Sequence, residues 1–139
     1  MSIFNKKGSA EIVAFVLVLP FLILPIANTV LMMTDLLIYD KIRQAARNAV
    51  LQMEIDGGLT ASGLYNTEAY LESKGLDLSK VDIDYTPYPV EYGDEVRIKI
   101  SYAYTSKRFF IELGGIKRVD KETTMVYGPL SSISKKYKR

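Results

Sequence analysis

The uncharged stretch over residues 12–34 constrains this chain more than any other feature. Its 23 residues, IVAFVLVLPFLILPIANTVLMMT, contain no acidic or basic side chain. The hydrocarbon core of a bilayer is about 30 Å thick, and about 20 apolar helical residues cross it. Buried helices of soluble proteins are rarely this apolar on every face. The sequence therefore predicts a single transmembrane helix over residues 9–35, with one small domain behind it.

A short basic leader, residues 1–8, precedes the apolar run. Its Lys6 and Lys7 favour the cytoplasmic side, because positive charge beside a membrane span tends to stay inside. We therefore expect a single-pass protein of the cytoplasmic membrane with its N-terminus inside and its C-terminal domain outside. A removed secretory signal peptide begins in the same way. The length of the run, and the lack of a small-x-small site near its end, favour a retained anchor.

The helical period continues beyond Asp35, although the polarity changes. No proline or glycine interrupts it before Gly57. We expect one unbroken helix from about Glu11 to about Ile55, whose second half, residues 36–56, is amphipathic and covers the rest of the domain. Apolar residues recur there at steps of three and four positions: Tyr39, Ile42, Ala45, Ala46, Ala49 and Met53.

Residues 57–128 are expected to form a small extracytoplasmic α+β domain. A short helix is predicted over 68–74, capped by Asn66 or Thr67 and ended by Gly75. Alternating apolar residues and turn residues predict three antiparallel strands, over 81–85, 95–105 and 119–127. Three strands need an apolar cover, which the amphipathic half of the long helix supplies. The fold class is therefore α+β, a long N-terminal helix packed on a small antiparallel sheet.

Two further segments have more than one interpretation. Phe109, Phe110 and Ile111, beside a pair of basic residues, could form a subunit contact or a membrane-proximal patch, but burial under the sheet is favoured. The basic tail over 129–139 could touch anionic lipid or a partner, and a disordered solubilising end is the default expectation.

Composition argues against an enzyme and against several kinds of partner. The chain has no cysteine and no histidine, which removes thiol chemistry, the commonest general base and the commonest metal ligand. Its acidic clusters near residues 82–84 and 91–95 lack calcium-loop spacing and are expected on a solvated strand face and turn. A net charge of +2 gives no case for nucleic acid. We expect no cofactor and no metal.

One face of the predicted membrane helix carries polar and small side chains. Asn28 and Asp35 lie seven positions apart, and Ala27, Leu31 and Thr34 stand beside them. Such a stripe suits contact between membrane helices. The alternative is that Asn28 only satisfies a carbonyl freed by a proline, and that Asp35 lies among the headgroups.

Glu11 and the prolines are further candidates for assembly. Glu11 lies at the cytoplasmic edge of the span, where a lone carboxylate is costly unless it is paired or reaches the interface. Pro20 and Pro25 each remove one backbone hydrogen bond from the span. A bent anchor is the simpler interpretation; a helix that partly melts among copies of itself is the other.

The segment KKGSAEIVAFVLVLP, followed by a long helix and by DKIRQAARNAVLQM, carries a family resemblance. It resembles the TadE-like pilins and pseudopilins of tight-adherence systems, and more closely their relatives in Gram-positive secretion or conjugation-type gene sets. In that superfamily a prepilin peptidase cuts after a glycine that ends a basic leader. The resemblance implies that Gly8 precedes the cut and that Ser9 becomes the new N-terminus. Glu11 is third after this cut, whereas the family usually has its glutamate fifth.

The resemblance covers about the first 55 residues and implies a pilin-like fold and a structural function. The chain would be a membrane-anchored subunit of a Tad or type IV pilus-like assembly or secretion system. Its partners would be the bilayer, copies of itself in an oligomer or surface filament, other pilin-like or assembly-platform membrane proteins, and a prepilin peptidase. The alternative is an uncleaved bitopic accessory subunit of a membrane translocation complex.

Overall fold

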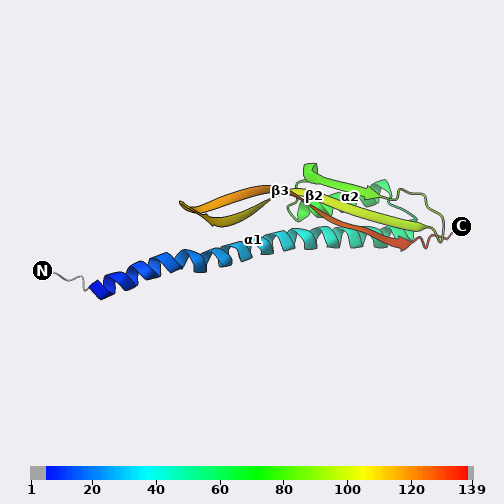
Figure 1. The fold of residues 1–139 in the computed structure, drawn as a ribbon. Coiled ribbons are helices and arrows are strands. Elements are labelled where there is room, and N and C mark those ends of the chain that lie inside the picture. The colour runs from blue at the N-terminus through cyan, green and yellow to red at the C-terminus, as the bar shows by residue number, and fades with distance from the viewer. Residues whose placement is uncertain (1–5, 138–139) are drawn as a thin grey trace. The chain divides into compact units, whose positions relative to one another are not determined.

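A computed structural model describes residues 6–137 of the chain. It has an α+β fold in which one long N-terminal helix packs on a three-stranded antiparallel sheet of order β1-β2-β3, as the sequence predicts (Figure 1). The elements in chain order are α1 (Lys6–Asp56), α2 (Ala61–Ser73), the 3-10 helix η1 (Leu78–Lys80), β1 (Val81–Tyr85), β2 (Glu95–Glu112) and β3 (Gly115–Ile133).

The described residues form two compact units. The first contains residues 6–34 and the segment Ser106–Lys121. The second contains Asp35–Thr105 and residues 122–137. Residues 1–5 of the expected leader, and 138–139 of the expected tail, lie outside the described part of the chain.

The core of the second unit lies on the face of α1 that the periodicity predicts. Ile42, Ala46 and Met53 are completely buried there. Alanines predominate on this face, so the sheet can approach the helix backbone closely. The core consists of Ile42, Ala45, Ala46, Ala49, Val50, Met53, Leu59, Leu71, Leu76, Val96, Ile98, Ile100 and Tyr102.

The strands confirm the predicted alternation but not all of the predicted bounds. β1 pairs with β2 in the register Val81–Tyr102 to Tyr85–Ile98, and the alternate side chains of β2 from Val96 onward are buried. The predicted ends of the second and third strands were wrong, because β2 continues to Glu112 and β3 begins at Gly115. Strand pairing continues there although the alternation of apolar and polar residues has ended.

The start of α2 is a second correction. The helix begins at Ala61 rather than near residue 68, and its cap is Thr60, whose hydroxyl accepts a hydrogen bond from Gly63 N–H at 3.1 Å. Thr67, predicted as a cap, lies inside the helix and donates to the Gly63 carbonyl at 2.8 Å. Gly63, which precedes the predicted helix in the sequence, lies inside α2, and a Cβ there would lie 3.1 Å from Leu59 Cδ1, a tight contact.

The C-terminal segment closes the second unit instead of beginning a free tail at residue 129. β3 runs to Ile133, and Ser134 pairs through its backbone with Gly93 and Asp94. Lys135 then donates its backbone N–H to the Glu54 carbonyl at 2.7 Å, and its ammonium to the Glu54 carboxylate at 2.6 Å. The default expectation of a disordered end is therefore wrong for this stretch.

Candidate membrane and assembly surface

The first half of α1 presents an apolar surface with little cover. One described helix, this one, is long and apolar enough to cross a membrane by length and composition. Pro20 and Pro25 both lie inside it without ending it. Large apolar side chains are exposed on several faces, among them Phe15, Leu17, Phe21, Ile26 and Met33. This surface is compatible with a single membrane span.

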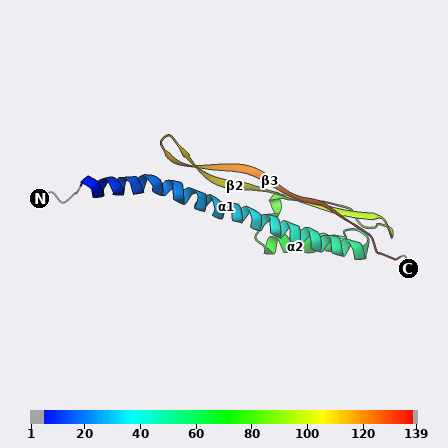
Figure 2. The same cartoon turned by 60° about the horizontal axis from the view of Figure 1, so that its bottom comes forward.

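The other part of the first unit is a hairpin, Ser106–Lys121, which we call the arm. It consists of the end of β2, a turn at Leu113 and Gly114, and the start of β3. Figure 2 shows the arm alongside the first half of α1. The favoured expectation of burial under the sheet was wrong for Phe110 and Ile111, which are exposed, whereas Phe109 is half-buried. Apolar side chains stand exposed near the tip of the arm: Phe110, Ile111, Leu113 and Ile116.

A reciprocal pair of hydrogen bonds holds the arm to α1. Asn28 Nδ2 donates to the Phe109 carbonyl at 2.9 Å, and Phe109 N–H donates to Asn28 Oδ1 at 2.9 Å. One turn away, Leu24 is only 8% exposed, whereas its neighbour Ile23 is 51% exposed. Among the described residues of this unit only the arm lies outside the helix, so the arm covers the stripe that contains Leu24 and Asn28.

The predicted assembly residues therefore have different environments. Asn28 and the half-buried Pro20 lie on the stripe that faces the arm. Thr34 donates to the Val30 carbonyl at 3.3 Å, within its own helix. Asp35 is half-buried where the second unit begins, and Glu11 is exposed.

The predicted processing residues lie close to the N-terminal end of the described helix. Gly8 and Ser9 are both half-buried and helical, within the first turns of α1. A Cβ built on Gly8 would meet no atom within 4 Å. Packing therefore does not explain why glycine stands at this position.

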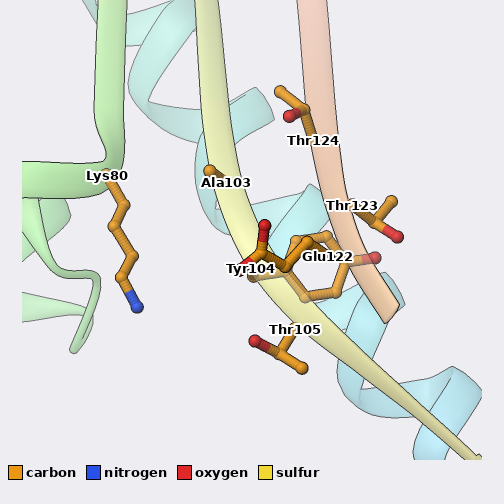
Figure 3. A pocket seen from close by; sticks show the side chains of 7 residues that line it. All are labelled: Lys80, Ala103, Tyr104, Thr105, Glu122, Thr123 and Thr124. Carbon is orange, nitrogen blue, oxygen red and sulfur yellow. The ribbon is translucent and has the colours of Figure 1, made fainter. Parts of the chain in front are cut away.

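The hollows of the second unit offer little for small-molecule chemistry. One, of about 240 Å³, is open to solvent and lined by side chains from β2, β3 and the residue before β1 (Figure 3). The Lys80 ammonium stands apart from the other lining groups in that view. Within residues 6–137, no cluster of three carboxylates could hold a metal ion.

Comparison with models of known protein families, with curated proteins and with solved structures finds no match.

Sequence reasoning missed the arm as an element. The signal was present, since an apolar group at residues 109–111 and another near the tip are flanked by charged residues on both strands. A strand with one buried face alternates apolar and polar residues, and residues 106–112 do not. The partner of Asn28 left no signal, because it is the backbone of Phe109 rather than a side chain.

Proposed function

We propose that this chain is a single-pass, membrane-anchored, pilin-like structural subunit without enzymatic activity. The N-terminus would be cytoplasmic and the second unit would lie outside. One observation carries the proposal: a single 51-residue helix has an exposed apolar first half and a second half that forms the core of a small domain. A helix of that kind needs lipid or neighbouring helices around its first half while the domain folds on the second.

The difference between the exposed apolar first half of α1 and its second half, which belongs to the domain core, suits assembly with copies of the same chain best. The arm covers one stripe of α1, and side chains such as Phe15, Phe21 and Ile26 remain exposed on the others. In the membrane these side chains contact lipid. In a filament of the Tad or type IV pilus type, neighbouring helices would replace that lipid after extraction by an assembly platform.

Topology is tested with a single cysteine in an otherwise cysteine-free chain. Ser131 is exposed on β3, so Ser131→Cys should react on whole cells with a membrane-impermeant thiol reagent once any wall barrier is controlled for. Ala10→Cys, at the cytoplasmic end of the span, serves as the matched site that reacts only after lysis. Labelling of Ser131→Cys only after lysis would overturn the orientation.

Processing is tested by mass spectrometry of the intact N-terminus. If a prepilin peptidase acts, the mature chain begins at Ser9, and Gly8→Leu leaves the leader attached. Both residues lie in the first turns of α1, so cleavage requires that end of the helix to open. A mature, assembled chain that begins at Met1 or Ser2 would exclude cleavage.

A second function, an uncleaved accessory subunit of a translocation complex, is favoured by two observations. Glu11 is third rather than fifth after the expected cut. Asn28, the polar residue best placed for a neighbouring helix, is already bonded to the arm of its own chain. An unprocessed N-terminus together with the absence of cross-linked ladders in membranes would select this function over the first.

A further inference from the structure

We propose that the arm has two alternative partners: its own helix α1 when α1 is outside lipid, and the outer headgroup layer when α1 spans the membrane. The arm would thus be released on membrane insertion and close again on extraction. This inference rests on the proposed function, since it requires α1 to cross a bilayer.

The closed state is the one that the structure shows. β1 pairs with β2 only as far as Tyr102, so no strand within residues 6–137 pairs with the outer edge of β2 along the arm. Asn28 satisfies the N–H and the carbonyl of one residue on that edge, Phe109. Leu24 is covered in the same arrangement. The amide pair and the covered Leu24 are thus contacts of the arm with the part of α1 that would span the membrane.

In the closed state the arm contacts the same part of α1 that lies in the hydrocarbon core when the helix spans the membrane. About 20 helical residues cross a 30 Å core, and the uncharged run contains 23 residues. Every window of about 20 residues within that run includes both Leu24 and Asn28. When α1 spans the membrane through this run, the residues that hold the arm lie within hydrocarbon.

The arm itself is poorly suited to hydrocarbon. It carries five basic and two acidic side chains. Its ion pairs, Lys117–Glu112 at 3.4 Å and Arg118–Asp120 at 2.8 Å, are solvent-exposed. Both of its outer edges present backbone groups with no neighbouring strand among the described residues, and hydrocarbon supplies no hydrogen-bonding partner for them. The arm therefore leaves α1 when the helix enters lipid.

The composition of the arm indicates where it goes. Its tip is apolar, with Leu113 fully exposed beside Phe110 and Ile116. The surplus of three positive charges favours an anionic headgroup layer. An apolar edge inside a basic border is typical of segments that lie at the membrane interface. Release also uncovers Asn28, which then becomes available to a neighbouring helix.

The test places fluorescent reporters in the full-length chain, reconstituted in vesicles of phosphatidylcholine and phosphatidylglycerol. Single cysteines replace Leu113 at the arm tip, Ile23 in the span and Ala69 on α2, all exposed residues. Nitroxide lipids labelled at the headgroup or at mid-chain serve as quenchers. At Leu113 the headgroup quencher should be about twofold or more stronger than the mid-chain quencher. Ile23 should show the reverse, and Ala69 should respond to neither.

The other outcomes separate the two proposals. Stronger mid-chain quenching at Leu113 would mean that the arm stays on α1 inside the core, which overturns release. Quenching at Ile23 with none at Leu113 would overturn the headgroup contact. Docking of the tip on a second copy of the chain would give this result. A lack of quenching at Ile23 would instead overturn the span, and with it the proposed function.

Amide exchange at Phe109 gives a second measurement on the same vesicles. With the arm released, this amide should exchange about as fast as the other amides on the outer edge of β2, and Asn28→Leu should leave its rate unchanged. A slow Phe109 amide that Asn28→Leu accelerates about tenfold or more would show the closed state persisting in lipid, and would overturn the proposal. Asn66→Leu, at an exposed site on α2, is the matched control.

Discussion

The two units use their aromatic residues differently. All ten tyrosines belong to the second unit, and the four phenylalanines among the described residues belong to the first. Tyrosine combines an apolar ring with a hydroxyl that needs a polar partner, which suits a small domain in water. Tyr39 and Tyr127 meet edge to face at 5.6 Å, and Tyr70 donates a hydrogen bond to Gln44. Phenylalanine has no polar group, which suits a surface covered by lipid or by other helices.

The two units also differ in how they are held together. The second has a buried core on both helix and sheet, and its C-terminal segment is hydrogen-bonded to residues near Gly93 and Glu54. In the first, Leu24 is the buried apolar residue among the described ones, and Asn28 supplies the link to the arm. The second unit therefore carries its stability within itself, whereas the first depends on what surrounds it.

The largest expected effect is on the core of the second unit. Ile98→Ala removes a completely buried side chain and should lower the free energy of unfolding by about 2–5 kcal/mol. Ile55→Ala, at a position on α1 that is 73% exposed, should change it by less than about 0.5 kcal/mol. Near-UV circular dichroism during urea unfolding in micelles measures both, because every tyrosine reports on this unit. If the two variants lowered the free energy of unfolding equally, the buried core would not be what stabilises the second unit.

Two glycines allow the units to be compared at matched backbone angles. Gly128 in the second unit has φ +108°, and Gly114 at the arm tip has φ +126°, so alanine is strained at either position, by about 1–3 kcal/mol. Only at Gly128 would the new Cβ also lie 2.6 Å from a backbone oxygen, that of Ile98. Gly128→Ala should therefore lower the urea midpoint of the tyrosine signal, and Gly114→Ala should leave it unchanged. A comparable loss from Gly114→Ala would mean that the two units unfold together.

The third expected effect is on association in the membrane rather than on folding. Asn28→Leu and Asp35→Leu should each weaken contact between α1 helices by about 0.6–2 kcal/mol and shorten cross-linked ladders in membranes. Asn28→Leu, which lies in the first unit, should leave the tyrosine signal unchanged. Val30→Leu, on an exposed part of the same helix, is the control. Unchanged ladders in both variants would remove this stripe from the assembly surface.

The sequence predicted what depends on local pattern. The face of α1 around Ile42 and Met53, the strand Val81–Tyr85 and the alternation along β2 all follow from periodicity. The sequence did not predict what depends on contacts between distant backbone groups. Thr60 caps α2 several residues before the predicted start of the helix, and Phe109 bonds to Asn28 through its main chain. The order of side chains in the sequence does not indicate which distant backbone groups will form hydrogen bonds.

The smallest expected effect concerns pH and is confined to the second unit. Hydrogen bonds from Lys135 and from Ser132 hold the pKa of the Glu54 carboxyl below its ordinary value of 4.5. A carboxyl with a lowered pKa in the folded state stabilises the fold above the unfolded pKa, and that contribution is lost as the pH falls through the folded value. The second unit should therefore lose stability as the pH drops below about 4.5.

Glu54→Gln should be less stable than the natural chain at pH 7, and the difference should shrink under acid. Glu72→Gln makes the same change of charge on the surface of α2 and should match the natural chain at both pH values. Urea midpoints of the tyrosine signal at pH 7 and pH 3.5 measure the effect; a Glu54→Gln deficit that persists undiminished at the lower pH would show that lost packing, and not the ionised carboxylate, had caused it.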